Sequence, residues 1–147
     1  MNYRIMTESD IDTVIPLYME YYNTNGDCWT QETAHRRIWQ VLGSPDSYCL
    51  IAEQQGAILG FAIGRFETYS DLTAYDLIEI VIAAEQQGKG YGTAFMQELE
   101  VRVKAKGAAM VQLQAVHDEM HDHFYKKLGY YTAENLVLKA KFLEEAL

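Results

Sequence analysis

The chain has 147 residues, of which 49% are hydrophobic and 22% charged, and its formal net charge at pH 7 is −9. These values are typical of one globular domain spanning residues 1–147, and they exclude a disordered chain, a collagen-like repeat and a disulfide-rich scaffold. The acidic excess argues against nucleic acid or membrane partners, because phosphate groups attract basic surfaces. The longest apolar run, 80–84, is far shorter than a membrane helix and no signal peptide is evident, so a cytoplasmic location is expected.

The first third of the sequence predicts a short strand and two helices. Residues 3–6 have the composition of a strand, and apolar residues then recur at helical spacing from 11 to 22. Pro16 interrupts this pattern and is expected to bend the helix, because proline removes a backbone donor. A second helix is expected to begin after Thr30, which can cap it, and to end at Gly43.

Strand-like patterns dominate the rest of the chain. They cover residues 48–53, 58–66, 75–83 and 110–116, and two last strands are expected within 130–142. Two further helices are expected at 91–106 and 118–128, each followed by a glycine. The expected fold class is therefore mixed α/β, of the α+β-like kind, with more strands than helices.

A glycine-rich loop, Gln87-Gly88-Lys89-Gly90-Tyr91-Gly92, lies between the strand at 75–83 and the helix at 91–106. The first backbone N–H groups of a helix lack acceptors within the helix, so they can bind an anion, and glycines let a phosphate approach closely. The residue after Lys89 is a glycine, which excludes a nucleotide P-loop. A dinucleotide-binding loop, whose glycine spacing differs, and a plain turn into the helix stay open as alternatives.

A family resemblance favours a third interpretation of this loop. Residues 87–92 resemble the Gln/Arg-x-x-Gly-x-Gly/Ala signature of the GCN5-related N-acetyltransferases, the GNAT superfamily. Residues 124–130, Phe-Tyr-Lys-Lys-Leu-Gly-Tyr, resemble the C-terminal Tyr-x-x-x-Gly-Phe/Tyr segment of that family. The order of the expected elements also matches, so the resemblance covers essentially the whole chain. It implies a GNAT-type acyl-CoA N-acyltransferase fold, with about four helices and a central, mostly antiparallel sheet that contains a splayed pair of parallel strands.

The resemblance also implies acetyl-coenzyme A (acetyl-CoA) as cosubstrate. Its pyrophosphate is expected on the N–H groups of the loop, while the preceding strand is expected to contribute its last residues. In the family, the main-chain N–H at the position of Ile82 polarises the thioester carbonyl and so stabilises the developing oxyanion. The residues expected to bind acetyl-CoA are Ile80, Ile82, Gln87, Gly88, Lys89, Gly90, Tyr91, Gly92 and Thr93.

The implied reaction is direct attack of a primary amine on acetyl-CoA in a ternary complex. A primary amine with a pKa near 10.4 is neutral in only roughly one molecule in 10³ at pH 7, so a base must remove its proton. The resemblance favours Glu79 as this base, while Asp76, His117 and water stay open as alternatives. On a regular strand Asp76 and Glu79 would point to opposite faces, unless a bulge intervenes. Tyr125 matches the family position of the proton donor to the departing thiolate.

Asp118 and His121 depart from the family pattern ahead of Tyr125, since members often carry Asn and Ala at these positions. The chain is therefore expected to lack a side-chain amide for the pantetheine arm of the cofactor, and Asp118 is expected to cap its helix instead. His117 and His121 are four residues apart, as metal ligands on one helix face often are, but no metal is expected here.

The first two helices and their loop are expected to select the acceptor, as in the family. Their aromatic and acidic residues suit a cation, through charge pairing and ring-face attraction, so a cationic small-molecule amine is the favoured acceptor. These residues are Tyr18, Glu20, Tyr21, Tyr22, Asp27, Trp29 and Glu32. Acetylation of a protein lysine or N-terminus stays open, as does a non-catalytic acyl-CoA-binding regulatory module. A homodimer is compatible with the family.

Overall fold

The computed structural model describes residues 1–144, which divide into two compact units, Met1–Gln114 and the residues from Ala115 onward. The elements of the first unit are β1 (Asn2–Ile5), the 3-10 helix η1 (Glu8–Asp10), α1 (Ile11–Thr24), α2 (Gln31–Leu42), β2 (Leu50–Gln54), β3 (Ala57–Thr68), β4 (Thr73–Ile82), the 3-10 helix η2 (Ala84–Gln86), α3 (Tyr91–Ala105) and β5 (Met110–Leu113). The second unit contains α4 (Glu119–Lys127). None of the described helices is both long enough and apolar enough to cross a bilayer.

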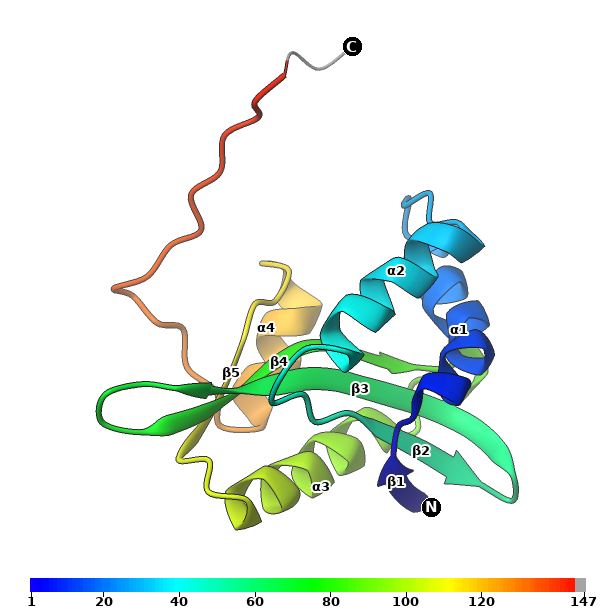
Figure 1. Cartoon of the computed structure of the whole chain (residues 1–147), viewed down its shortest axis with the longest axis horizontal. Helices are drawn as coiled ribbons and strands as arrows, with labels where there is room; N and C mark the ends of the chain where they lie inside the picture. The colour runs from blue at the N-terminus through cyan, green and yellow to red at the C-terminus, as the bar shows by residue number, and fades with distance from the viewer. Residues whose placement is uncertain (145–147) are drawn as a thin grey trace. The chain divides into compact units, whose positions relative to one another are not determined.

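The five strands of the first unit form one sheet in the order β1-β2-β3-β4-β5 (Figure 1). Neighbouring strands are antiparallel except β4 and β5, which are parallel. Helices α1 and α2 cover one face of this sheet, and α3 lies against the other (Figure 1). With four α-helices along the described chain, the arrangement confirms the expected mixed α/β fold.

The apolar core on the α1–α2 face follows the helical spacing seen in the sequence. Each fully buried Val, Ile or Phe side chain in this core contributes about 1.5–3 kcal/mol. The helical residues buried here include Ile11, Val14, Ile15, Tyr18, Ala34, Ile38 and Val41, and the sheet contributes Ile51, Phe61, Ile63 and Val81. Pro16 does not end α1, which continues from Ile11 to Thr24 as one helix.

A β-bulge in β4 changes which of its side chains share a face. Ile63 of β3 opposes Glu79, whereas the next residue of β3 opposes Leu77, so Ile78 is an extra residue in β4. Side chains alternate between the two faces along a regular strand, and one extra residue reverses that alternation. Asp76 therefore lies on the α1–α2 face, the same face as Glu79.

The parallel pair formed by β4 and β5 is short. The two strands pair only from Ala74 to Leu77 of β4, although β4 itself continues to Ile82. The pairing ends beside the bulge at Ile78. Over residues 78–82, β4 therefore pairs with β3 alone within the described sheet, which is the splayed parallel pair expected from the resemblance.

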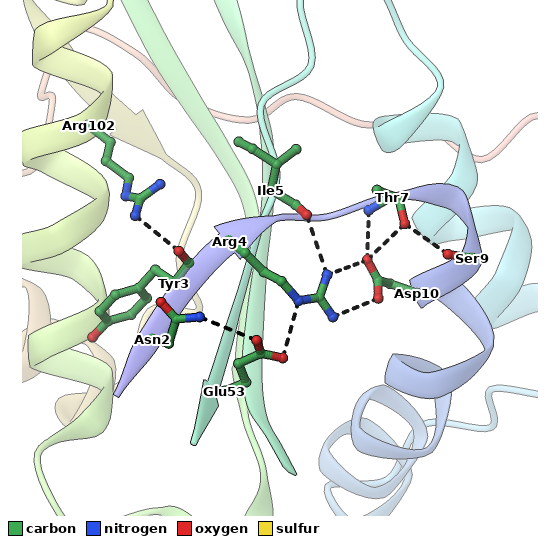
Figure 2. A network of polar contacts seen from close by, with 9 residues as sticks. All are labelled: Asn2, Tyr3, Arg4, Ile5, Thr7, Ser9, Asp10, Glu53 and Arg102. Carbon is green, nitrogen blue, oxygen red and sulfur yellow. Dashed lines mark hydrogen bonds and ion pairs between the residues drawn. The ribbon is translucent and has the colours of Figure 1, made fainter. Parts of the chain in front are cut away.

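A polar network fastens β1 to the elements around it (Figure 2). The Arg4 guanidinium donates two hydrogen bonds of 2.9 Å to the carboxylate of Asp10, at the start of the α1 region. It donates a third, of 3.2 Å, to Glu53 on β2. Arg102 of α3 donates to a backbone carbonyl of β1 at 3.1 Å. Because hydrogen bonds that involve charged groups are stronger than neutral ones, this network helps to fix the edge strand β1.

In the second unit, the two ends of α4 are defined by specific hydrogen bonds. Asp118 is the N-cap, and its carboxylate accepts from the His121 N–H at 2.7 Å, which confirms the expected capping role. Beyond the last turn, Gly129 has a φ of +93°, in the left-handed region that favours glycine. This conformation lets the Tyr130 N–H donate to the Tyr125 carbonyl at 3.0 Å.

The two strands expected within residues 130–142 do not form: residues 130–144 contain no strand. The apolar side chains that carry the strand-like pattern are exposed, with Leu138 at 80% and Phe142 at 90%. Apolar content and alternation describe the side chains alone, whereas a strand also needs a neighbour that pairs its backbone N–H and C=O groups. The local pattern does not supply that neighbour, so the prediction was wrong.

Replacing Asp10 with alanine is expected to lower the free energy of unfolding by about 1–3 kcal/mol, because Arg4 and the Thr7 N–H lose a charged acceptor. The Arg4 hydrogen bond lowers the pKa of Asp10, so its contribution is present above the pKa of the unfolded chain. The contribution is lost as the pH falls through the lower pKa of the folded state. Urea unfolding at neutral and acidic pH measures both effects.

The matched control for this prediction is Asp12→Ala, which removes an exposed carboxylate two residues further along the chain. The Asp12 variant should unfold at nearly the wild-type urea concentration. The difference between the Asp10 variant and the wild type should shrink on acidification. Equal losses in both variants at neutral pH would contradict the structural role given to Asp10.

Candidate active site

Glu79 accepts hydrogen bonds from three side chains of the α1–α2 layer. Arg37 of α2 donates to Oε1 from Nη2 at 3.1 Å and from Nε at 3.3 Å. The phenol of Tyr18 donates to the same oxygen at 3.3 Å, and the phenol of Tyr22 donates to Oε2. The side chain of Glu79 is only 10% exposed. These four residues, called here the Glu79 cluster, join α1 and α2 to the middle of β4.

The charges within the Glu79 cluster support one another. Burial raises the pKa of Tyr18 and of Tyr22, and the charge of Glu79 raises both further, so both phenols stay protonated and act as donors. Burial acts to lower the pKa of Arg37, but the hydrogen bond and the charge of Glu79 outweigh it, and this pKa is raised overall. Both oxygens of Glu79 therefore accept hydrogen bonds from protonated or charged donors, which hold its carboxylate between α1 and α2.

Asp76 shares a face of β4 with Glu79 but has different surroundings. Among the described residues, no side chain forms a hydrogen bond with its carboxylate. Burial raises the pKa of Asp76 and the charge of Glu67 raises it further, while Arg65 partly opposes them. Arg65 is itself bound to Glu67 at 2.8 Å. An accessible lone pair and a raised pKa are the properties that a general base requires.

The glycine-rich loop, residues 87–92, has a backbone conformation that favours glycine at two of its positions. Gly88 and Gly90 have φ angles of +77° and +84°, and a Cβ on either residue would meet no atom within 4 Å. Gly90 is the N-cap of α3, and no side chain caps this helix. The first turn of α3 contains no acidic residue, in contrast to the first turns of α1, α2 and α4. The N–H groups at the start of α3 are thus open to an anion.

Two residues near the end of β4 direct backbone groups away from β3, toward the side of the strand that has no partner. The Ala83 N–H donates to the Leu59 carbonyl at 2.8 Å, so these opposed residues form a hydrogen-bonded pair. Hydrogen-bonded pairs alternate with non-hydrogen-bonded pairs along an antiparallel ladder. Ile82 and Ile80 occupy the alternate positions, so their N–H and C=O groups point away from β3. On that side β4 has no partner strand beyond Leu77 within the described sheet.

The residues expected to bind acetyl-CoA therefore lie along one continuous stretch of backbone in the first unit. Ile80 and Ile82 are at the end of β4, Gln87, Gly88, Lys89 and Gly90 form the loop, and Tyr91, Gly92 and Thr93 begin α3. Within this stretch the Gln87 amide donates to the Ile82 carbonyl at 3.1 Å. Lys89 donates to the Gln86 side chain at 3.4 Å and is exposed.

Tyr125 lies on α4, in the second unit. Its ring packs against Phe124, with ring centroids 5.0 Å apart, and against Tyr130 at 5.7 Å. The Gly129 turn described above positions Tyr130 against Tyr125, which gives a physical reason for the Tyr-x-x-x-Gly-Tyr spacing. The nearby His117 side chain is 97% exposed and lies 3.3 Å from Asp122.

His121 is bound to the carboxylate of its own N-cap residue, Asp118, at 2.7 Å. This contact and the backbone hydrogen bond from His121 both lower the pKa of Asp118, the backbone bond having the larger effect. Over residues 1–144, no three His, Cys, Asp or Glu side chains converge in a way that could hold a metal ion.

Sequence reasoning did not identify Arg37. The signal was nonetheless present, because Ala34, Arg37, Ile38 and Val41 have the spacing of one helix face, and the other three are buried. A cation within an otherwise apolar stripe requires a buried anion as partner. Only the tertiary structure identifies that partner as Glu79.

A shallow, open surface pocket of about 380 Å³ lies at the loop between α1 and α2, lined by Asp27, Cys28, Trp29 and Thr33. The Trp29 indole donates to the Asp27 carboxylate at 3.2 Å. The Trp29 ring also meets the Tyr18 ring edge-on, with centroids 5.0 Å apart. Aromatic contact therefore links this pocket to the Glu79 cluster, and Asp27 and Trp29 are two of the residues expected to select the acceptor.

Comparison with known proteins agrees with this architecture. Similar solved structures include a predicted acetyltransferase with acetyl-CoA from Clostridium acetobutylicum (17% identity, TM-score 0.75, 95% of this chain and 95% of that chain). A second is glucosamine-6-phosphate N-acetyltransferase from Arabidopsis thaliana, with 20% identity, a TM-score of 0.70 and coverage of 97% of this chain and 98% of that chain. A third is a transcriptional regulator from Bacillus halodurans C-125, with 17% identity, a TM-score of 0.77 and coverage of 96% of this chain and 99% of that chain. At these identities the likeness establishes the fold. A family model described as "Acetyltransferase (GNAT) family" matches residues 11–130, and the chain therefore belongs to that family.

Proposed function

We propose that this protein is an acetyl-CoA-dependent N-acetyltransferase that transfers the acetyl group to a primary amine by direct attack in a ternary complex. One observation carries the proposal: α3 is the next α-helix after β4, its start is uncapped and free of acidic residues, and β4 has lost its parallel neighbour at its own end. In a member of the GNAT family, this combination suits a ligand with a pyrophosphate at one end and a reactive carbonyl at the other.

The pyrophosphate of acetyl-CoA is assigned to the loop and the first turn of α3. The left-handed conformations of Gly88 and Gly90 turn the chain without placing side chains over the N–H groups. The helix dipole adds partial positive charge at the same point, and Lys89 adds a full positive charge nearby. A doubly anionic group is accordingly bound by backbone atoms, although the protein as a whole carries a net charge of −9.

The thioester is assigned to the unpaired side of β4. The N–H groups of Ile80 and Ile82 point away from β3, where no described strand competes for them. A backbone N–H fixed beside the thioester oxygen stabilises the negative charge that develops when the amine attacks. The side chains at these two positions can be apolar, because only the main chain takes part.

The general base is assigned to Asp76, in preference to Glu79. Asp76 has a carboxylate without a hydrogen-bonded side chain and a raised pKa, whereas both oxygens of Glu79 already accept hydrogen bonds. In this assignment Asp76 removes a proton from the ammonium form of the acceptor, directly or through a water. Glu79 then holds Arg37 and the two phenols in place on the same face. His117, largely exposed and paired with Asp122, is the weaker alternative.

Tyr125 is assigned, by resemblance, to protonate the departing thiolate as the C–S bond breaks. A phenol with a pKa near 10 gives its proton to a thiolate whose acid has a pKa near 8.5, which is uphill by roughly 2 kcal/mol. The phenol therefore assists the departure of the thiolate without being essential to it.

The acceptor is assigned to the cationic small-molecule amines. The pocket at the α1–α2 loop presents an indole ring and a carboxylate side by side, and a cation is attracted by both. The pocket is connected to the Glu79 cluster through Tyr18, which places it on the α1–α2 side of the sheet with Asp76. A cytoplasmic location and the absence of a nucleic acid partner belong to the same proposal.

The function is tested by calorimetry with acetyl-CoA, followed by measurement of free thiol with amines grouped by charge and size. We expect saturable heat and amine-dependent thiol release, which should be fastest with di- and polycationic amines. Carboxylic acids of matching size that lack an amine serve as controls. Absence of heat would remove the proposal. Heat without thiol release would favour the regulatory module, and release with lysine peptides alone would favour a protein acceptor.

The base is tested by the dependence of kcat/KM on pH in two variants. Protonation of a base abolishes its action, so kcat/KM should fall as the pH drops through the pKa of Asp76. Asp76→Asn should remove this acidic limb and lower kcat/KM by about 10²–10⁴-fold. Glu79→Gln should keep the limb and instead lower the free energy of unfolding by about 1–3 kcal/mol, because Arg37 loses its charged acceptor.

Asp71→Asn, which changes an exposed carboxylate on the loop between β3 and β4, is the matched control for both variants. Its pH profile and its stability should match those of the wild type. If Glu79→Gln lost the acidic limb while Asp76→Asn kept it, the roles given to the two carboxylates would have to be exchanged.

Tyr125→Phe tests the assignment of the proton donor. The expected result is a decrease in kcat of about 10–10³-fold with little change in the KM for acetyl-CoA, because the ring packing is kept and only the hydroxyl is lost. Tyr131→Phe, at a side chain that is 83% exposed, is the control. An unchanged kcat under conditions where the chemical step is rate-limiting would exclude the acid role of Tyr125.

A further inference from the structure

The side chain of Gln87 reaches back to the end of β4. Its amide nitrogen, Nε2, lies 3.1 Å from the carbonyl oxygen of Ile82, five residues earlier in the chain. A backbone carbonyl can only accept hydrogen bonds, so the group facing it must be the NH₂ of the amide and not its oxygen. Gln87 therefore donates to the last peptide of β4, across the turn formed by η2.

The bonded carbonyl belongs to the residue whose N–H is assigned to the thioester. Ile82 stands in a non-hydrogen-bonded pair with β3, so its N–H and its C=O both point to the unpaired side of the strand. A ligand that approaches from that side meets both the N–H donor and the C=O acceptor of Ile82. If the Ile82 carbonyl oxygen has no hydrogen-bond donor of its own, its partial negative charge repels a thioester oxygen that approaches the Ile82 N–H.

We propose that Gln87 is a positioning residue: its amide binds the Ile82 carbonyl and so leaves the Ile82 N–H as the group that this residue offers to the acetyl carbonyl. The hydrogen bond also holds the start of the glycine-rich loop against the end of β4, across η2. This inference rests on the proposed function, because it supposes that acetyl-CoA binds along β4. It gives the side chain of Gln87 a role separate from that of its backbone in the loop.

The neighbouring Gln86 provides a natural comparison. Its side-chain oxygen accepts from Lys89 at 3.4 Å, and no hydrogen bond joins its side chain to β4 in the described part of the chain. Gln87 is exposed, so its hydrogen bond contributes little to the free energy of unfolding. A change at Gln87 should therefore alter how the protein recognises the acetyl group while leaving its stability unaltered.

The test compares the dissociation constants of acetyl-CoA and of free CoA, measured by calorimetry. The two ligands share the pyrophosphate, but only acetyl-CoA has the thioester carbonyl, so the ratio of their constants reports the hydrogen bond to that carbonyl. Wild type should bind acetyl-CoA more tightly than CoA. In Gln87→Met, which keeps the length of the side chain and removes the donor, the ratio of the two dissociation constants should fall by about three- to tenfold.

Two further variants make the result decisive. Gln86→Met should keep the wild-type preference, and Gln87→Arg should also keep it, because arginine retains N–H donors of similar reach. Thermal unfolding checks that each variant is folded. If Gln87→Met kept the full preference, or Gln86→Met lost it equally, or Gln87→Arg failed to keep it, the role of Gln87 would be overturned. A wild type without preference would overturn it too, whereas a wild type that binds neither ligand would overturn the proposed function itself.

Discussion

The loss of one neighbour along β4 is the constraint on which the proposed site depends. In a strand inside a sheet, the backbone N–H and C=O groups form hydrogen bonds with the two neighbouring strands. In this protein β5 stops pairing at Leu77, and the last five residues of β4 keep only β3. The donors of Ile80 and Ile82 are consequently left for something other than a strand. Because α3 begins shortly after this edge, its unpaired N–H groups add to the same donor-rich stretch of chain.

The bulge at Ile78 determines which face of the sheet the two carboxylates of β4 point to. Without the extra residue, Asp76 and Glu79 would point to opposite faces of the sheet. With it, both face the α1–α2 layer, but at different points along the strand. Glu79 meets the helices directly and is held by Arg37 and two phenols. Asp76 lies earlier in β4, opposite Arg65, and no described side chain forms a hydrogen bond with it. Position along one strand thus separates a carboxylate that holds helices together from one that remains able to accept a proton.

The sequence predicted those features that are encoded within a few residues of each other. The caps at Thr30 and Asp118 are of this kind, because the side chain and the N–H that it binds are three residues apart. The ends of the helices at Gly43 and Gly129 are others, since a glycine follows the last helical residues in the sequence itself. The register of β4 against β3 could not be predicted, because a bulge depends on how two strands pair. The partner of Arg37 lies 42 residues away, and the failed strands at 130–142 had the right side chains but no neighbour.

The conformation of the glycine-rich loop has a consequence for the thermodynamics of ligand binding. Glycine has more freedom in the unfolded chain than any other residue, and fixing it costs conformational entropy. Here Gly88 and Gly90 are already ordered, and the Gln87 amide already closes the turn onto β4. The entropy is therefore lost when the chain folds and need not be lost again when a ligand arrives. A rigid, preorganised loop of this kind can bind an anion through main-chain atoms alone, at the expense of a slightly less stable fold.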